Sequence, residues 1–111
     1  MAQNGNGQPK SAFERSLERQ ANAKLDLRLY VLGASLRSAS AIKRVKELCE
    51  RHLFGRYDLK VIDLYQQPEL ARAAQIIAAP TLVRNYPPPL RRMIGDLSNE
   101  KAVLRALGVA A

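Results

Sequence analysis

The sequence predicts a single α/β domain. Two observations predict it: a strand–helix–strand unit in the first half, and a helix–strand–strand–helix series in the second. The chain has 111 residues, enough for one domain, which we place at residues 25–108. Residues 1–24 are expected to form a flexible extension because the first ten are polar and rich in Asn, Gly and Gln. Within it, Phe13 and Leu17 are spaced for a short helix.

The first half of the domain has the pattern of a βαβ unit. Apolar and polar residues alternate over residues 25–32, which predicts a strand. Ser35 or Ser38 can cap the helix that follows, where apolar residues recur at helical spacing. A second strand over residues 57–65 is apolar on both faces, and this predicts an interior position in the sheet.

The second half contains more prolines and weaker periodicity. Pro80 is placed to enter an edge strand. The expected elements are a helix over 68–77, a strand over 81–83, a turn or extended edge over 87–89, a strand over 90–94 and a last helix capped by Ser98. The resulting order, βαβαββα, is that of a thioredoxin-like fold. In such a fold we expect a cis peptide between Ala79 and Pro80.

The position of a redox motif in this fold carries no cysteine. Ser35 and Ser38 stand at the four-residue spacing where two thiols would lie, and a serine hydroxyl cannot exchange disulfides. Cys49 lies on the apolar side of the predicted helix, and His52 has no triad companions in the pattern. We therefore predict a protein that is not an enzyme and that holds no cofactor or metal.

The chain is basic, with a formal net charge of +8. The lysines and arginines are scattered and lack the paired aromatic residues that stack on bases, so a nucleic-acid-binding module is the weaker alternative. A basic surface that selects an acidic protein partner agrees better with this distribution. No apolar run is long enough to span a membrane, and the absence of a secretory pattern predicts a cytoplasmic protein.

Residues 87–99 form a long and compositionally unusual motif, PPPLRRMIGDLSN, that is highly specific. Shorter characteristic stretches are residues 29–31 with Gly33, residues 59–63 and residues 79–82. In these stretches, and over residues 25 to about 107, the sequence resembles the KaiB family of the cyanobacterial circadian clock.

The resemblance implies a regulator that changes its fold. KaiB-like proteins have a dimeric or tetrameric ground state with a βαββααβ order, which we expect for the isolated oligomer. They also have a monomeric thioredoxin-like state that binds KaiC, a hexameric ATPase and kinase. The implied function is circadian or hourglass-like timing through a KaiC-type partner. A thioredoxin-like stress or chaperone protein without a CxxC motif is the other alternative.

The resemblance also implies site residues. Partner-binding positions are Lys43, Arg84 and Tyr30, although Tyr30 fits a packing role equally well. Positions for the oligomer or the fold switch are Pro80, Pro87, Pro88, Pro89, Arg91, Arg92, Gly95 and Asp96. We expect Gly95 to adopt a positive φ in a turn.

Several positions depart from the family pattern. Ser40 stands where clock KaiB proteins usually have arginine, and residues 70–75 replace an acidic stretch. The acidic C-terminal tail is missing, and a 24-residue N-terminal extension is added. These departures weigh against binding of KaiA and leave a KaiC-type ATPase as the expected partner.

Overall fold

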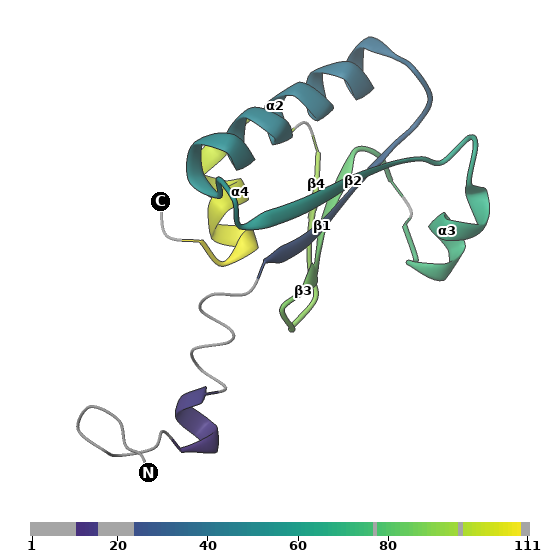
Figure 1. Ribbon diagram of the computed structural model, residues 1–111. Helices are drawn as coiled ribbons and strands as arrows, with labels where there is room; N and C mark the ends of the chain where they lie inside the picture. The colour runs from purple at the N-terminus through teal and green to yellow at the C-terminus, as the bar shows by residue number, and fades with distance from the viewer. Residues whose placement is uncertain (1–10, 16–23, 77, 96, 110–111) are drawn as a thin grey trace.

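A four-stranded sheet organises the computed structural model, which describes residues 11–15, 24–76, 78–95 and 97–109 (Figure 1). The elements in chain order are β1 (Leu25–Val31), α2 (Leu36–His52), β2 (Tyr57–Asp63), α3 (Pro68–Ala73), β3 (Thr81–Tyr86), β4 (Arg91–Ile94) and α4 (Glu100–Leu107). This βαβαββα order confirms the thioredoxin-like fold class. The rearranged order expected for an isolated oligomer stays a prediction.

The strands lie in the order β2-β1-β3-β4. β1 pairs in parallel with β2 and antiparallel with β3, and β3 pairs antiparallel with β4. Two predicted positions are therefore wrong: β2 is an edge strand, and β3 lies inside the sheet. Because β1 takes the centre, the outer strand β2 is only partly covered, and its apolar Val61 remains exposed. Pro80 precedes the first residue of β3, so its missing N–H removes no bond from the ladder.

The two faces of the sheet are covered differently. α2 and α4 pack on one face, where alternate residues of β1 meet apolar residues of both helices (Figure 1). α3 lies on the other face, where Leu70 and Ala74 pack against a smaller cluster of Tyr30, Ile62 and Val83. The larger core thus lies beneath α2 and α4, and α3 covers only part of the opposite face.

Helix α3 ends earlier than predicted, at Ala73 instead of residue 77. Gln75 adopts a left-handed φ of +56°, and the Ile76 N–H donates to the Ala71 carbonyl oxygen. The guanidinium of Arg92, on β4, donates to the carbonyl oxygens of Ala74 (2.8 Å) and Gln75 (2.9 Å). These bonds satisfy carbonyl groups that a longer helix would have paired internally.

The last helix begins one residue later than predicted. Asn99, not Ser98, is its N-cap, and the Asn99 Oδ1 accepts a 3.0 Å hydrogen bond from the Ala102 N–H. Either residue type can cap a helix, so the sequence alone left the choice open by one position.

In the N-terminal region, residues 12–15 form a short helical turn. The Glu14 N–H donates to the Ser11 Oγ (3.0 Å), and the Ser11 N–H donates to the Glu14 Oε1 (2.9 Å), which is a capping box. Residues 1–10 and 16–23, which carry most of the expected flexible extension, lie outside the described residues. In the described part of the chain, no helix has both the length and the apolar character needed to cross a bilayer.

Candidate docking surface

Asp63, the last residue of β2, ties together two loops at the carboxyl ends of β1 and β2. Its Oδ1 accepts hydrogen bonds from the Gly33 N–H (3.0 Å) and the Tyr65 N–H (2.9 Å). The Leu64 N–H also donates to the Val31 carbonyl oxygen (2.9 Å). The loop before α2 is therefore fixed against the turn before α3.

Two features of this arrangement favour glycine at position 33, its backbone conformation and the space beside it. Its φ of +67° lies in the left-handed region that favours glycine. A Cβ atom at this position would also lie 2.8 Å from the ring of Tyr65. The Tyr65 ring, which lies against Gly33, would have to shift to admit such an atom.

The two serines at the redox position have structural roles. Ser35, one of the two caps that the sequence allowed, is the N-cap of α2, and its Oγ accepts a 3.1 Å bond from the Ser38 N–H. The Ser35 hydroxyl donates to the Ser38 Oγ (3.0 Å), and the Ser38 hydroxyl donates to the Leu32 carbonyl oxygen (3.3 Å). Both hydroxyls are thus engaged in holding the start of α2.

The single cysteine of the chain lies away from this surface. Cys49 is buried in α2, and burial is the main cause that raises the pKa of its thiol to about 12. A thiol that stays protonated at neutral pH is a poor nucleophile. Among the described residues, no cluster of His, Cys, Asp and Glu has the arrangement of a metal site.

Three apolar side chains are exposed around this rigid junction. Leu36 is 89% exposed, Tyr65 71% and Leu32 46%. Lys43 follows Leu36 by two helical turns, so it lies on the same exposed side of α2. We call Leu32, Leu36, Lys43 and Tyr65 the α2 docking surface.

Arg84 and Tyr30, two other predicted partner-binding residues, are buried. The guanidinium of Arg84 donates to the carbonyl oxygens of Leu107 (2.7 Å) and Pro89 (2.9 Å). Burial, followed by the nearby charge of Arg91, lowers the pKa of Arg84. Tyr30 packs with Ile62 and Val83 beneath α3. In this fold both residues have internal roles, and their contact with a partner stays a prediction.

The residues predicted for the oligomer or the fold switch are spread over both ends of β3 and β4. Pro80 is buried and follows a cis peptide bond, as expected, and cis bonds also precede Pro87 and Pro89. Arg91 is exposed, as is Arg92, whose guanidinium binds the end of α3. Gly95 has the expected positive φ, +127°. Pro88 is exposed between two of these positions, and Asp96 lies outside the described residues.

His52 joins the far end of α2 to α4. Its Nε2 lies 2.9 Å from the Glu100 Oε2, and Arg51 forms an ion pair with the same carboxylate. These contacts, His52 first, lower the pKa of Glu100. His52 is therefore a connection between helices, and it has no serine beside it in the described contacts.

Sequence reasoning missed Leu32, Leu36 and Tyr65, the apolar members of this surface, and also Asp63, which holds its loops together. The sequence does contain a signal for Asp63, which is an acidic residue at the end of a strand and can accept bonds from neighbouring loops. The exposure of Tyr65 and Leu36 had no sequence signal, because apolar residues at such positions are more often buried.

Comparisons with known proteins agree on one family. The model of the KaiB domain matches residues 28–109. The circadian clock protein KaiB3 of Synechocystis sp. is 42% identical over 83 residues, which cover 75% of this chain and 81% of that protein. The circadian clock oscillator protein KaiB of Prochlorococcus marinus subsp. pastoris is 48% identical over 81 residues, covering 73% and 76%.

Solved structures agree with the fold. The N-terminal domain of SasA from Synechococcus elongatus has a TM-score of 0.64 at 19% identity, covering 92% of this chain and 89% of that domain. Chloroplastic thioredoxin z has a TM-score of 0.62 at 17% identity, covering 89% and 88%. At these identities, the likeness concerns the fold alone.

Proposed function

Because the chain belongs to the KaiB family, we propose that it is a non-enzymatic timing regulator that binds a KaiC-type hexameric ATPase. The named relatives are circadian clock proteins, and this chain covers about three quarters or more of the length of each. The α2 docking surface is the part of the chain that we assign to the ATPase.

One observation carries this assignment. At the place where a redox protein of this fold has its thiols, this chain has exposed apolar side chains on a fixed backbone. Asp63 and the serine hydroxyls hold the loops, so little conformational entropy is lost when Leu36 and Tyr65 meet a partner. Preorganised apolar residues of this kind are typical of the centre of a protein interface.

The charge beside the apolar residues indicates the chemistry of the partner. Lys43 is exposed on the same side of α2 as Leu36, and Arg37 and Arg44 are exposed nearby. The partner surface would present an apolar contact with carboxylates around it. Such complementarity raises the association rate and selects against basic partners.

The thioredoxin-like order is the one that the family resemblance assigns to the partner-binding state. We propose that the isolated chain also populates the rearranged oligomeric fold, and that binding draws the population towards the thioredoxin-like state. If the change of fold precedes binding, the observed rate of complex formation will reach a ceiling as the ATPase concentration rises.

Size-exclusion chromatography of the full chain mixed with a KaiC-type ATPase and ATP tests the partner. We expect a complex that forms slowly, over minutes or longer. Absence of a complex at high micromolar concentration would overturn the assignment. A complex that forms within the mixing time would retain the partner and reject the slow change of fold.

Charge reversal then tests the surface. Lys43→Glu is expected to weaken the complex about tenfold, because the added carboxylate faces an acidic partner. Lys101→Glu is the matched control, since Lys101 is an exposed lysine on α4. Leu36→Ser is expected to weaken the complex by a similar factor through loss of the apolar contact. Equal affinities for all three variants and the parent would place the interface elsewhere.

A further inference from the structure

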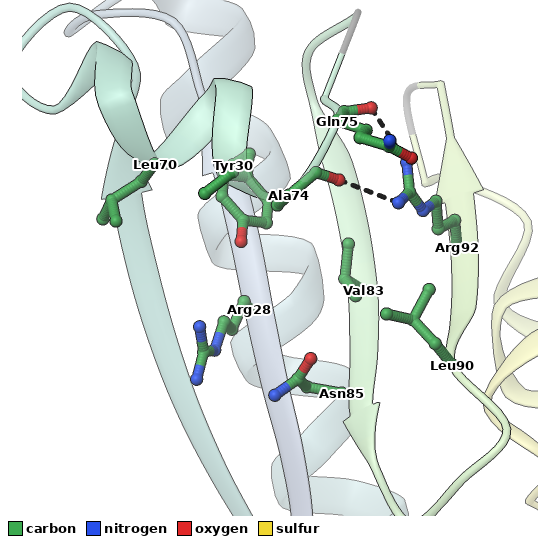
Figure 2. A pocket seen from close by; sticks show the side chains of 10 residues that line it. Arg28, Tyr30, Leu70, Ala74, Gln75, Val83, Asn85, Leu90 and Arg92 are labelled. Carbon is green, nitrogen blue, oxygen red and sulfur yellow. Dashed lines mark hydrogen bonds between the residues drawn. The ribbon is translucent and has the colours of Figure 1, made fainter.

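The face of the sheet opposite α2 and α4 contains a hollow beside α3 (Figure 2). Its volume is about 270 Å³. Tyr30 and Val83 line it from the sheet, Leu70 and Ala74 from the α3 region, and Leu90 from the segment between β3 and β4. Figure 2 shows that α3 lies over Tyr30 but leaves the region of Arg28 and Asn85 uncovered. No part of this hollow belongs to the α2 docking surface.

One row of the sheet is unusually basic on this face. Arg28 is directly opposite Lys60 of β2 and opposite Val83 of β3, and Val83 is opposite Arg92 of β4. Directly opposed residues point to the same face of a sheet. The row therefore presents three cations from three strands around one apolar residue.

Arg28 and Lys60 are like charges directly opposite each other, which is unfavourable in a sheet, whereas Val83 separates Arg92 from them. The next row of the same face carries Asp26 opposite Asp58. Asp26 supplies one carboxylate, whose Oδ2 lies 3.5 Å from the Arg28 guanidinium and accepts a 3.3 Å bond from the Asn85 amide. Within the described residues, no carboxylate pairs with Lys60 or Arg92. The partners of Arg92 are the neutral carbonyl groups of Ala74 and Gln75.

The hydrogen-bonding groups at the hollow are also incompletely used. The Arg28 Nε is enclosed and has no hydrogen-bond partner. Figure 2 shows the Tyr30 hydroxyl pointing from beneath α3 towards the uncovered region. A buried donor without a partner is destabilising, so a ligand that lets the Arg28 side chain turn to bind an acceptor would gain from this site.

We propose that this hollow binds a small carboxylic acid with an apolar body, about the size of one or two aromatic rings. The planar guanidinium of Arg28 matches a carboxylate, with Arg92 and Lys60 adding positive charge. Val83, Leu70 and Leu90 supply the apolar contact that a small-molecule pocket requires. The volume lies just below the range of drug-sized pockets, about 300–1,000 Å³, which limits the ligand to a small acid.

The test is a titration of the ¹⁵N-labelled full chain with naphthalene-2-carboxylate, followed by amide spectra. We expect saturable shifts confined to residues 28–30, 73–75, 83–85 and 90–92. Naphthalene-2-carboxamide, which has the same shape without the charge, is expected to bind at least about fivefold more weakly. Equal affinity for acid and amide would overturn the proposal, as would shifts on the α2 side of the sheet or no saturation below about 10 mM.

Variants of the full chain test whether Arg28 supplies the positive charge that binds the carboxylate. Arg28→Gln is expected to weaken binding of the acid about tenfold, while Arg105→Gln, an exposed arginine on α4, should leave it unchanged. Leu90→Glu places a carboxylate at the wall of the hollow, so it should weaken binding of the acid and not of the amide. This half-exposed position tolerates the change even if Arg28→Gln fails to fold. An unchanged acid-to-amide ratio in Leu90→Glu would reject the site.

A tripeptide ending in phenylalanine distinguishes the source of such a carboxylate. If the free acid of this tripeptide binds more tightly than naphthalene-2-carboxylate, the ligand is a protein C-terminus. If naphthalene-2-carboxylate binds more tightly, the ligand is a free metabolite. Contacts from the Phe13 ring to the Val83 methyl groups in the free protein would instead show that the chain fills its own hollow, and would overturn the proposal.

Discussion

The two faces of the sheet differ in how completely they are covered. Beneath α2 and α4, Leu27 and Leu29 are fully buried, and the buried Arg84 is bonded to two carbonyl groups. Beside α3, the other face presents Arg28 of β1, Arg92 of β4 and a hollow. The comparison indicates that one face supplies most of the stability, while the other leaves polar groups available for recognition.

The largest expected difference between the faces is in the unfolding free energy that is lost when an apolar side chain is truncated. Leu29→Ala should lower the free energy of unfolding by about 2–5 kcal/mol, because it leaves a cavity in the closed core. Leu90→Ala, on the open face, should change it by less than about 0.5 kcal/mol. Urea unfolding of both variants measures the two values. Similar losses of unfolding free energy in both variants would show that the two faces contribute equally to stability.

Two arginines provide the next contrast, since each donates to two backbone carbonyl groups. Arg84→Met should lower the free energy of unfolding by about 1–3 kcal/mol, because the carbonyls of Pro89 and Leu107 lose a buried donor. Arg92→Met should cost less than about 1 kcal/mol, since water can replace an exposed guanidinium. If Arg84→Met is neutral, the cost of desolvating the guanidinium equals the gain from its bonds.

Gly95 lies where the chain leaves β4 for α4, and its N–H donates to the Pro80 carbonyl oxygen (3.2 Å). At a φ of +127°, Gly95→Ala should cost about 1 kcal/mol through backbone strain alone, because no atom crowds the added Cβ. We expect this cost to shift the balance between folds, which oligomer size and amide spectra would report. Identical size and spectra for variant and parent would contradict the expectation.

The smallest effect concerns Glu100, which bonds to His52 and Arg51 between α2 and α4. Because the folded-state pKa of Glu100 is lowered, its contribution to stability is present above the unfolded value, about 4.3, and is lost as pH falls through the folded value. The melting temperature of Glu100→Gln should therefore be slightly lower than that of the parent at pH 7. The difference should disappear in acid, and a difference independent of pH would show that the charge is not its cause.

Much of the architecture could be predicted because it depends on local patterns. Alternation over β1, the serine cap of α2 and the glycine after β4 are each encoded within a few residues. The motif at residues 87–99 was enough to indicate the family. The lack of thiols at the redox position was equally visible.

Apart from the shift of the last N-cap from Ser98 to Asn99, the errors involve contacts between distant residues. The end of α3 is bonded to Arg92, a residue 17 or 18 positions away, and local periodicity contains no trace of that contact. The edge position of β2 depends on which strands flank β1. The sequence predicted Arg84 to be a partner-binding residue at the surface. In the structure it is enclosed between the end of α4 and the prolines at residues 87–89.

Residue types and short spacings were enough to predict the element order, the lack of cysteines at residues 35 and 38 and the family. Tertiary packing was needed to show that Leu36, at the start of α2, and Tyr65, in the turn after β2, are exposed beside the junction held by Asp63. It also showed that Lys60, Arg28 and Arg92 share one row. Strand register and packing bring these residues together across the sheet, and neither is set by near neighbours in the chain.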